Sequence, residues 1–141
     1  MKRTIVVIGL TLAIGTALGI IGTRILYAQQ ELAKGKVLQR TDLVGAKGKE
    51  AVLVLRELPP GAESGIHYQS GNEVAYVLEG SVTLEVKGKP PVSLKPGETF
   101  QTRAKEVHNV KNVSPTAPVK VLVFYVIEKG KSLADISIPA K

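Results

Sequence analysis

Cysteine is absent from the 141-residue chain, and aromatic side chains make up only 4% of it. Without cysteine, the chain has no disulfide bond, no thiolate nucleophile and no cysteine-ligated zinc site. A metal site must therefore be built from His, Asp or Glu side chains, amides or water. The scarcity of aromatic side chains also removes the stacking platforms on which many proteins bind nucleic-acid bases.

The distribution of charge gives no sign of a nucleic-acid partner either. The formal net charge is +7, but three positive charges lie in the first 28 residues, which contain no acidic side chain. Residues 29–141 carry +4, and their lysines are scattered along the sequence without forming a block. A solvated basic surface accounts for this pattern, and we expect no nucleic-acid partner.

The N-terminal part of the chain has the layout of an export signal. Two basic residues precede the charge-free run 4–23, and the small residue Ala28 follows shortly after it. The run is longer than that of most cleaved signals and approaches the length that spans a bilayer. We expect 1–28 to be an apolar helix, either a signal peptide or a transmembrane anchor. Residues 29–141 then form one exported, periplasmic or extracytoplasmic domain, secreted or anchored to the inner membrane by 4–23.

After residue 30 the hydrophobic pattern alternates with a period of two, which is typical of β-strands. Gly and Pro turns separate the alternating segments, and no amphipathic helix is indicated. Segment 31–43 is either a short helix or a first strand, and 132–141 is either an edge strand or a loose tail. Strands are expected at 51–58, 73–78, 81–87, 92–94, 98–103, 107–113 and 119–127. The domain is therefore expected to be all-β, a sandwich or a barrel.

Two of these strands are apolar on both faces. Along 73–78, Val74 and Tyr76 oppose Ala75 and Val77, and nearly every residue of 119–127 is apolar. Strands of this kind are covered on both sides, by a second sheet or by a partner subunit. We predict a homodimer, and the alternative is a two-layer sandwich that covers both faces internally.

The two histidines of the chain, His67 and His108, stand in a pattern that suits a metal site. Gln69 lies two residues after His67, so a strand places both on one face, and Glu73 four residues later has the same parity. Glu73 converges on the same point if the strand continues across 70–72 or if a tight turn there carries it back. His108 opens a later strand. Two imidazoles and one carboxylate that converge in a barrel form a facial set of ligands for iron and related metals. Gln69 adds a fourth, oxygen ligand to this set.

Three further polar side chains are candidates for the site. Arg56 either points into the barrel and anchors an anionic substrate, or solubilises an edge strand. Tyr76 has the opposite parity to Glu73, so it is expected in a packing face outside the site. Glu63 is a candidate from the turn that precedes His67.

The spacing of these residues resembles the first motif of the cupin superfamily, G-x5-H-x-H-x3,4-E-x6-G. Its fixed positions fall on Gly61, His67, Gln69, Glu73 and Gly80, so residues 61–80 carry the motif with Gln69 in place of the second histidine.

The second cupin motif, G-x5-P-x-G-x2-H-x3-N, resembles residues 97–112. Gly97, His108 and Asn112 match with the spacing intact, whereas Arg103 and Lys105 replace the Pro and Gly of the motif. The short segment between the two motifs is similar to that of small single-domain bacterial cupins, of the type-2 or quercetin-dioxygenase-like kind. The change at 103 and 105 affects the hairpin that places His108.

This resemblance implies a jelly-roll (double-stranded β-helix) barrel with a divalent transition metal inside, Fe, Mn, Ni or Zn. By the same resemblance, His67, Glu73 and His108 are ligands and Gln69 is the fourth. The leading hypothesis is an exported metal-binding cupin, a dioxygenase-like oxidoreductase that acts on a small chelating substrate. The alternative is a non-catalytic module at the membrane surface that binds a small molecule or a metal.

Overall fold

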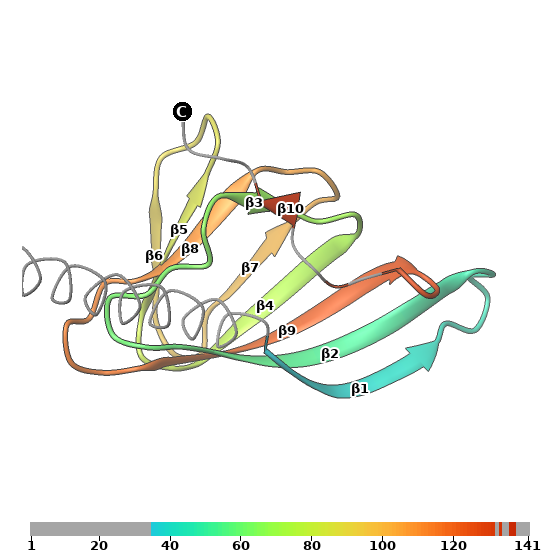
Figure 1. Cartoon of the computed structure of the whole chain (residues 1–141), viewed down its shortest axis with the longest axis horizontal. Helices are drawn as coiled ribbons and strands as arrows, with labels where there is room; N and C mark the ends of the chain where they lie inside the picture. Colours follow the sequence, from blue (N-terminus) through green and yellow to red (C-terminus); the bar gives the residue numbers. More distant parts are fainter. Residues whose placement is uncertain (1–34, 132, 134–135, 138–141) are drawn as a thin grey trace, which may run out of the picture. The chain divides into compact units, whose positions relative to one another are not determined.

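Two five-stranded antiparallel sheets make up the domain (Figure 1). The structure is a computed structural model that describes residues 35–131, 133 and 136–137. Its strands are β1 (Lys36–Asp42), β2 (Lys49–Leu58), β3 (His67–Tyr68), β4 (Asn72–Glu79), β5 (Val82–Val86), β6 (Val92–Leu94), β7 (Thr99–Thr102), β8 (His108–Asn112), β9 (Val119–Glu128) and β10 (Ile136–Ser137). The first sheet has the order β1-β2-β9-β4-β7 and is called the β9 sheet below; the second, the β8 sheet, has the order β10-β3-β8-β5-β6.

The all-β class predicted from the sequence is confirmed for the described residues, which contain no helix. All seven expected strands are present as β2 and β4 to β9, each within two residues of its expected bounds. Of the two alternatives for 31–43, the strand holds for the described part, as β1. Two residues of the C-terminal segment pair with β3 as the edge strand β10.

The segment predicted to be a signal or an anchor, 1–28, lies outside the described residues, as does the predicted boundary of the domain. Within the part of the chain that is described, no helix is long and apolar enough to cross a membrane.

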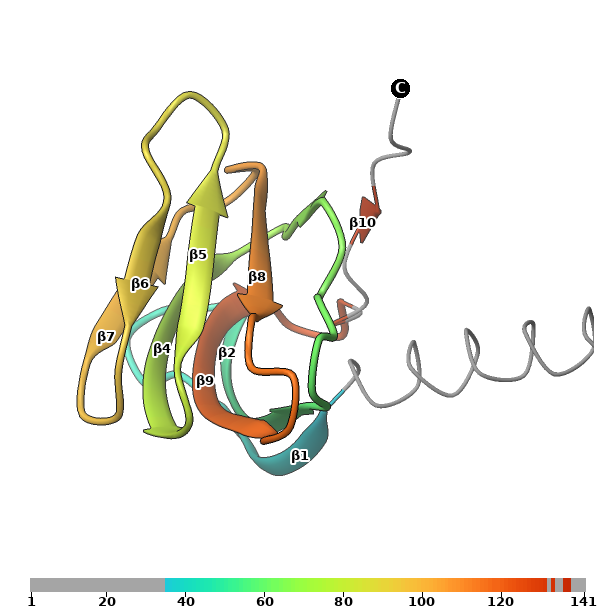
Figure 2. The ribbon, with the colours of Figure 1, turned by 90° about the vertical axis from the view of Figure 1, so that its left-hand side faces the viewer.

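The core lies between the two sheets, and β9 is at its centre. This strand pairs with β2 along its whole length and with β4 on its other side. Its alternation turns Val121, Val123 and Tyr125 inward, where Val82 and Val110 of the β8 sheet complete the same buried cluster. Each fully buried Val side chain contributes roughly 1.5–3 kcal/mol to folding. Figure 2 shows β5 and β8 in front of β4 and β9, as expected of two sheets packed face to face.

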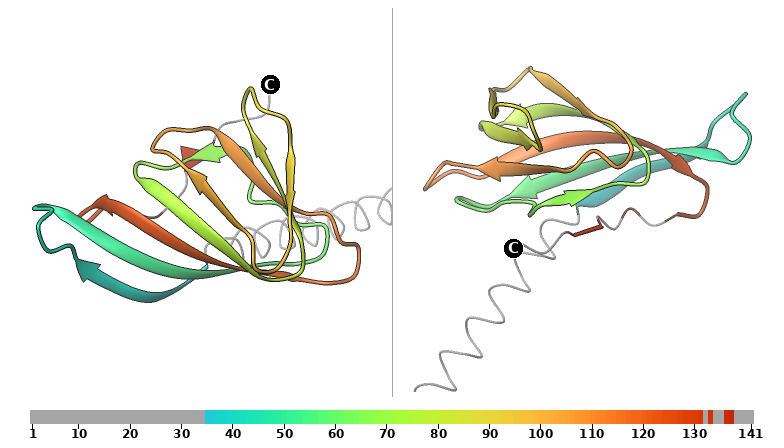
Figure 3. Two further views of the ribbon diagram at one scale, coloured as in Figure 1. Left: turned by 180° about the vertical axis from the view of Figure 1, so that it is seen from behind. Right: turned by 90° about the horizontal axis from the view of Figure 1, so that it is seen from above.

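The other face of the β9 sheet is apolar but exposed. Val74, Tyr76 and Phe124 point outward and keep 40–43% of their surface accessible. Val74 pairs with Phe124 across β4 and β9, so these side chains adjoin on one patch. The β1–β2 hairpin extends this sheet beyond the rest of the domain, as Figure 1 and both views of Figure 3 show. The second layer thus covers only the inner face, and the predicted homodimer stays a prediction.

Turns with a left-handed backbone bound the strands of the two motifs. Gly61, Gly80 and Gly97 have φ values of 69°, 75° and 93°, which cost glycine little. At Gly80 a Cβ atom would also lie 2.7 Å from a methyl group of Val119, so a larger residue does not fit. Lys105, where the second motif has glycine, is the non-glycine residue with positive φ in the described chain, at 65°. The hairpin before His108 therefore keeps a left-handed residue although the glycine is missing.

Candidate metal site

Both histidines come from the β8 sheet and meet at the edge of the cavity between the sheets. His67 on β3 and His108 on β8 are direct partners in the antiparallel register. Their ring centroids lie 4.3 Å apart, and each side chain is almost completely buried. Buried imidazoles in contact avoid charge repulsion only if at least one of them is neutral.

A backbone carbonyl orients each imidazole through its Nδ1 atom. His67 Nδ1 donates to the carbonyl oxygen of Gly65 at 2.7 Å, and His108 Nδ1 donates to that of Glu106 at 2.8 Å. Since a carbonyl can only accept, Nδ1 carries a proton in both rings, and the neutral form of each ring has its lone pair on Nε2. Nε2 of His108 is buried and has no hydrogen-bond partner among the described residues. An oriented imidazole with such an atom is the usual form of a metal-ligating histidine.

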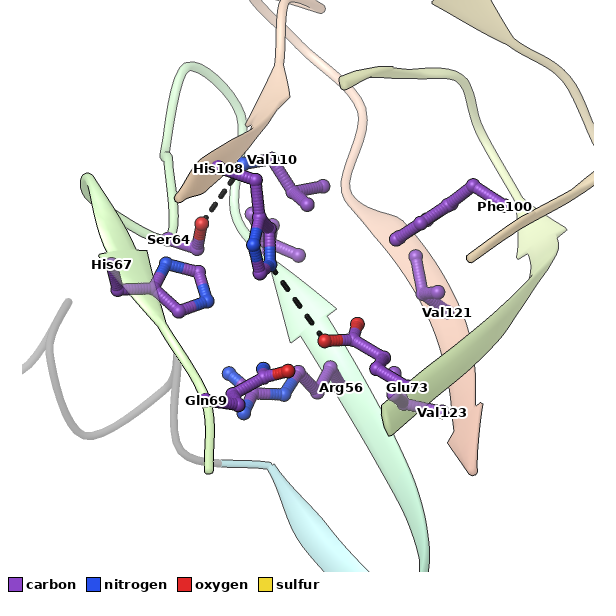
Figure 4. A pocket seen from close by; sticks show the side chains of 11 residues that line it. Arg56, Ser64, His67, Gln69, Glu73, Phe100, His108, Val110, Val121 and Val123 are labelled. Carbon is purple, nitrogen blue, oxygen red and sulfur yellow. Dashed lines mark hydrogen bonds and ion pairs between the residues drawn. The ribbon is translucent and has the colours of Figure 1, made fainter. Parts of the chain in front are cut away.

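The carboxylate of the site comes from the opposite sheet. Glu73 on β4 faces inward and is 4% exposed, and its Oε2 atom lies 3.7 Å from Nε2 of His108. Thr102 on β7 is its register partner and donates from Oγ1 to the same oxygen at 3.3 Å. Thr102 is fully buried, so this hydrogen bond is shielded from water. Figure 4 shows Glu73 facing His108 across the cavity.

Gln69 follows β3 directly and is also buried. Its Nε2 atom donates to the Tyr125 hydroxyl at 3.5 Å, a long hydrogen bond. Its backbone carbonyl accepts from the amide of Lys105 at 2.8 Å. This hydrogen bond ties the loop that contains Lys105 to the end of β3 and so holds the chain next to His67 in place.

Arg56 points into the cavity from an interior strand, so it is not a solubilising charge on an edge strand, and its role in anchoring an anionic substrate stays a prediction. It lies on β2 opposite Val121 of β9, is 9% exposed, and lines the same cavity as the histidines. Its guanidinium carbon lies 5.9 Å from the centroid of the Tyr125 ring, within the range of a cation–π contact. Tyr76 lies outside the cavity on the exposed face, and Glu63 is on the surface, where it accepts a hydrogen bond from Asn109.

All four predicted site residues line one cavity of about 20 Å³. This volume suits an ion or one or two water molecules and little more. The remaining walls are mostly apolar: Leu58, Phe100, Val110, Val121 and Val123. Among the described residues, however, no three His, Asp or Glu side chains are drawn together closely enough to form a metal-ion site as they stand. The four residues share a cavity, and their role as ligands stays a prediction.

An ionised carboxylate closes the loop that precedes His108. Glu106 accepts hydrogen bonds from Lys89 Nζ at 2.6 Å and from the Arg103 amide at 3.0 Å. These two hydrogen bonds, that of Lys89 first, lower the pKa of the Glu106 carboxyl below its usual value. The loop in which Arg103 and Lys105 stand in place of the Pro and Gly of the second motif is therefore stabilised by the hydrogen bonds of Glu106.

Sequence reasoning missed two polar side chains that border the site, Thr102 and Ser64. Ser64 lines the cavity, and its Oγ atom accepts from the amide of Val110 at 2.9 Å. For Thr102 a signal was available, because it has the same parity as the buried Phe100 in an expected strand. For Ser64 there was none, because it lies in an irregular segment with no periodicity to read.

Comparison with known proteins gives one family. Residues 54–125, just over half of the chain, match the family model described as "Cupin domain". No curated protein is similar enough in sequence to match. A solved structure from Klebsiella pneumoniae, an uncharacterized conserved protein with a double-stranded beta-helix domain, is 21% identical with a TM-score of 0.56. That match covers 74% of this chain and 84% of the other.

Two enzymes are also similar in structure. The DMSP lyase DddQ from Ruegeria pomeroyi is 21% identical over 65% of this chain, with a TM-score of 0.51. The oxalate decarboxylase of Bacillus subtilis, described with Mn(II) centres, is 18% identical over 66% of this chain, with a TM-score of 0.53. The matches cover only 44% and 25% of the lengths of these two enzymes. At such identities the likeness shows the fold alone.

Proposed function

The chain belongs to the cupin family, and from that premise we propose that it binds a divalent transition metal through His67, Glu73 and His108. The observation that carries the proposal is the state of His108. Its Nδ1 atom is fixed by a backbone carbonyl, while its buried Nε2 atom has no hydrogen-bond partner in the described chain and faces Glu73. A buried polar atom without a partner costs roughly 1–3 kcal/mol, and coordination of an ion removes that cost.

The donor set fits a borderline metal ion. Two neutral imidazoles and one carboxylate suit Fe, Mn, Ni or Zn, and leave positions open for a substrate. Gln69 is the fourth ligand in this proposal. Its amide oxygen is neutral and harder than an imidazole nitrogen, so it binds these ions less tightly than a second histidine of the motif would. A ligand of this strength is one that a substrate can displace.

The chemistry that we propose is that of a small metal-dependent enzyme on a chelating substrate, with a dioxygenase-like oxidation as the leading reaction. The ion would supply Lewis acidity and, if redox-active, the means to react with O₂. The chain's own part is to hold its ligands from two sheets, to exclude bulk water with apolar walls, and to fix both histidine protons on Nδ1. That enzymes as different as a lyase and a decarboxylase share this fold leaves the reaction class open.

The second candidate is a non-catalytic module that binds a small molecule or a metal. Two features favour it: Gln69 replaces a histidine of the motif, and the cavity has a volume of only about 20 Å³. Binding of a ligand without turnover supports this module, whereas ligand-dependent O₂ consumption supports the enzyme.

Export and self-association are part of the proposal. The layout of 1–28 supports an exported domain. Protease tests it when it is added to cells whose outer layer has been made permeable while the cytoplasmic membrane stays closed, because only an extracytoplasmic domain is then cleaved.

The exposed patch with Val74, Tyr76 and Phe124 supports a homodimer. Light scattering tests it: a molar mass equal to that of one chain rules the homodimer out.

The metal is tested by elemental mass spectrometry on the full chain, purified in mild detergent without chelator or affinity metal. We expect close to one transition-metal ion per chain, and almost none in a double variant, His67→Ala/His108→Ala. Glu73→Gln lowers the metal content as well, because it removes the anionic ligand. Glu57→Gln is the matched control, since Glu57 lies on β2 of the same sheet with its side chain exposed.

Two results decide the proposal. Stoichiometric metal that disappears in the double variant and persists in Glu57→Gln establishes the site and identifies the ion. Absence of metal from the folded wild-type chain, even after reconstitution with Fe²⁺, Mn²⁺, Ni²⁺ and Zn²⁺, overturns the proposal and leaves the binding module as the function.

A further inference from the structure

The carbonyl oxygen that orients the His108 ring belongs to Glu106, whose side chain also closes the turn before β8. We propose that Glu106 is a positioning residue of the metal site. Its carboxylate locks this turn, so that its carbonyl keeps the single proton of a neutral His108 ring on Nδ1. This inference rests on the proposed function, because a proton on Nδ1 is what leaves Nε2 open for the ion.

Two acceptors in the described chain face the His108 ring, one at each nitrogen. The Glu106 carbonyl oxygen lies 2.8 Å from Nδ1, and the Glu73 Oε2 atom lies 3.7 Å from Nε2 (Figure 4). The second distance is too long for a hydrogen bond, but a shift of less than about 1 Å would form one. A carboxylate is a stronger acceptor than a carbonyl, so a loosely held ring would move its proton to Nε2 and donate to Glu73. Nε2 would then have no lone pair for a metal ion.

The Glu106 side chain holds the turn 103–106 in place. Its Oε2 atom accepts from the Arg103 amide at 3.0 Å, while the Glu106 amide donates to the Arg103 carbonyl at 3.0 Å. Its Oε1 atom accepts from Nζ of Lys89, in the turn after β5, at 2.6 Å. The carboxylate is 22% exposed, so water shields these contacts only in part. They fix the Glu106 backbone from two sides, and with it the carbonyl that faces His108.

The departures from the second motif explain why this turn needs a carboxylate. A proline at 103 would have a fixed φ and no amide proton, whereas Arg103 has a freer backbone and an amide that needs an acceptor. Lys105 adopts a φ of 65°, which is unfavourable for a residue with a Cβ atom. The Glu106 carboxylate satisfies the amide of Arg103 and so stabilises a turn that lacks both rigid residues of the motif.

The position of His108 along the sheet does not depend on this carboxylate. His108 pairs with Val86 of β5, and the Lys87 amide donates to the Val107 carbonyl at 2.9 Å. These backbone contacts keep the start of β8 in the sheet when the Glu106 side chain is removed. Its loss should therefore loosen the carbonyl and the ring, and leave the strand folded.

The tautomer of His108 tests the inference and can be measured without a metal. Long-range ¹H–¹⁵N NMR correlations on the labelled full chain, metal-free and in mild detergent, distinguish a proton on Nδ1 from one on Nε2. A His67→Gln variant assigns the signals, because the chain has only two histidines. In mildly alkaline buffer we expect the wild type to show the Nδ1–H form alone. In Glu106→Ala the Nε2–H form should appear beside it, and the Kd for Mn²⁺ should rise about tenfold.

Three further variants separate positioning from a general loss of an ion pair. Glu79→Ala is the matched control, since Glu79 forms an exposed ion pair with Lys120 at 3.0 Å outside this turn. It should change neither the tautomer nor the Kd. Lys89→Met removes one of the two contacts of the Glu106 carboxylate and should give a smaller fraction of the Nε2–H form. Lys89→Arg keeps a cationic donor and should restore the wild-type spectrum.

Tautomer and metal content are measured separately, so that the two proposals fail separately. A folded Glu106→Ala chain with the Nδ1–H form alone overturns the inference, and so does a mixture of tautomers in the wild type. If the wild type binds no metal, the proposed function fails, while the spectra of the metal-free chains still decide the role of Glu106. If Glu106→Ala does not fold by circular dichroism, Lys89→Met replaces it under the same criterion.

Discussion

The two sheets supply the site with different kinds of groups and hold them in different ways. The β9 sheet provides the charged groups, Arg56 and Glu73, from strands that pair with β9 over nearly their whole length. The β8 sheet provides the two imidazoles, and β3 pairs with β8 only where His67 meets His108. Arg56 and Glu73 thus lie on long strands that are hydrogen-bonded to β9, whereas His67 lies on a strand of two residues.

This difference follows from what it costs to bury each group. A buried charge must stay in one environment, because a small shift away from its partner leaves it uncompensated. A neutral imidazole tolerates small shifts at much lower cost, and its orientation is fixed locally by one carbonyl. An ion bound to both sheets would therefore stabilise β3 in particular, because binding energy to the folded state adds to stability. Substitutions that change the hydrogen bonds or the backbone between the sheets and within them should differ in effect, and the largest effect is expected at Asn112.

Asn112 is a buried polar tie between the two sheets. From the end of β8, its Nδ2 atom lies within 3.1 Å of the carbonyl oxygens of Leu58, Pro59 and Ala117, and its Oδ1 atom accepts from the Ser114 amide. Asn112→Ala leaves several of these backbone groups without a partner. We expect a loss of about 3 kcal/mol in the free energy of unfolding, measured by urea denaturation.

The control for this variant is Asn72→Ala. Asn72 accepts one hydrogen bond, from the Ala104 amide, in an exposed position, and its removal is expected to cost less than about 1 kcal/mol. Equal losses in the two variants would contradict the role given to Asn112.

Thr102→Val tests the support of the charged group within the β9 sheet. The substitution removes the hydroxyl that donates to Glu73 and keeps the shape of the side chain. We expect the affinity for Mn²⁺ to fall about tenfold, as for other partners of metal ligands, with little change in the amount of folded protein. Competition with a chelating dye measures the affinity. Thr99→Val, at an exposed position of the same strand, is the control, and an unchanged affinity in Thr102→Val would remove Thr102 from the site.

The strands could be predicted because they depend on local alternation, whereas the four candidate ligands were grouped by the spacing of the two motifs. His67 and Glu73 lie in opposite sheets, which alternation along one strand does not predict. The sequence left open whether Arg56 points inward, because alternation shows which residues share a face of a strand but not whether that face lines the cavity or the solvent. In β9 both parities are apolar, so nothing in the pattern separates the buried Tyr125 from the exposed Phe124. The contacts of Thr102 and Ser64 depend on pairing between strands distant in the sequence. Such pairing is set by the packing of the whole domain.

Ser64→Ala weakens the segment that carries His67. Its hydroxyl accepts from the Val110 amide and donates to Asn109 Oδ1 at 3.2 Å, so it joins the residues before β3 to β8. Backbone hydrogen bonds in the same segment remain, and we expect a loss of only about 1 kcal/mol in the free energy of unfolding. Ser93→Ala on the exposed side of β6 is the control. A larger loss in metal affinity than in Thr102→Val would mean that β3, and not Glu73, limits binding.

Lys105→Gly sharpens the comparison because it should improve the weaker side of the site. Lys105 has φ of 65° and its amide holds the carbonyl of Gln69, so its strained backbone is what fixes the chain after β3. Glycine relieves the strain, but it also gives the unfolded chain more freedom, and the net gain is expected to be about 0.5 kcal/mol. Lys95→Gly, at an exposed lysine without positive φ, has only the second effect and should destabilise the chain. Opposite signs in urea denaturation would show that the left-handed backbone at 105, in the loop whose amide holds the carbonyl of Gln69, is strained with lysine there.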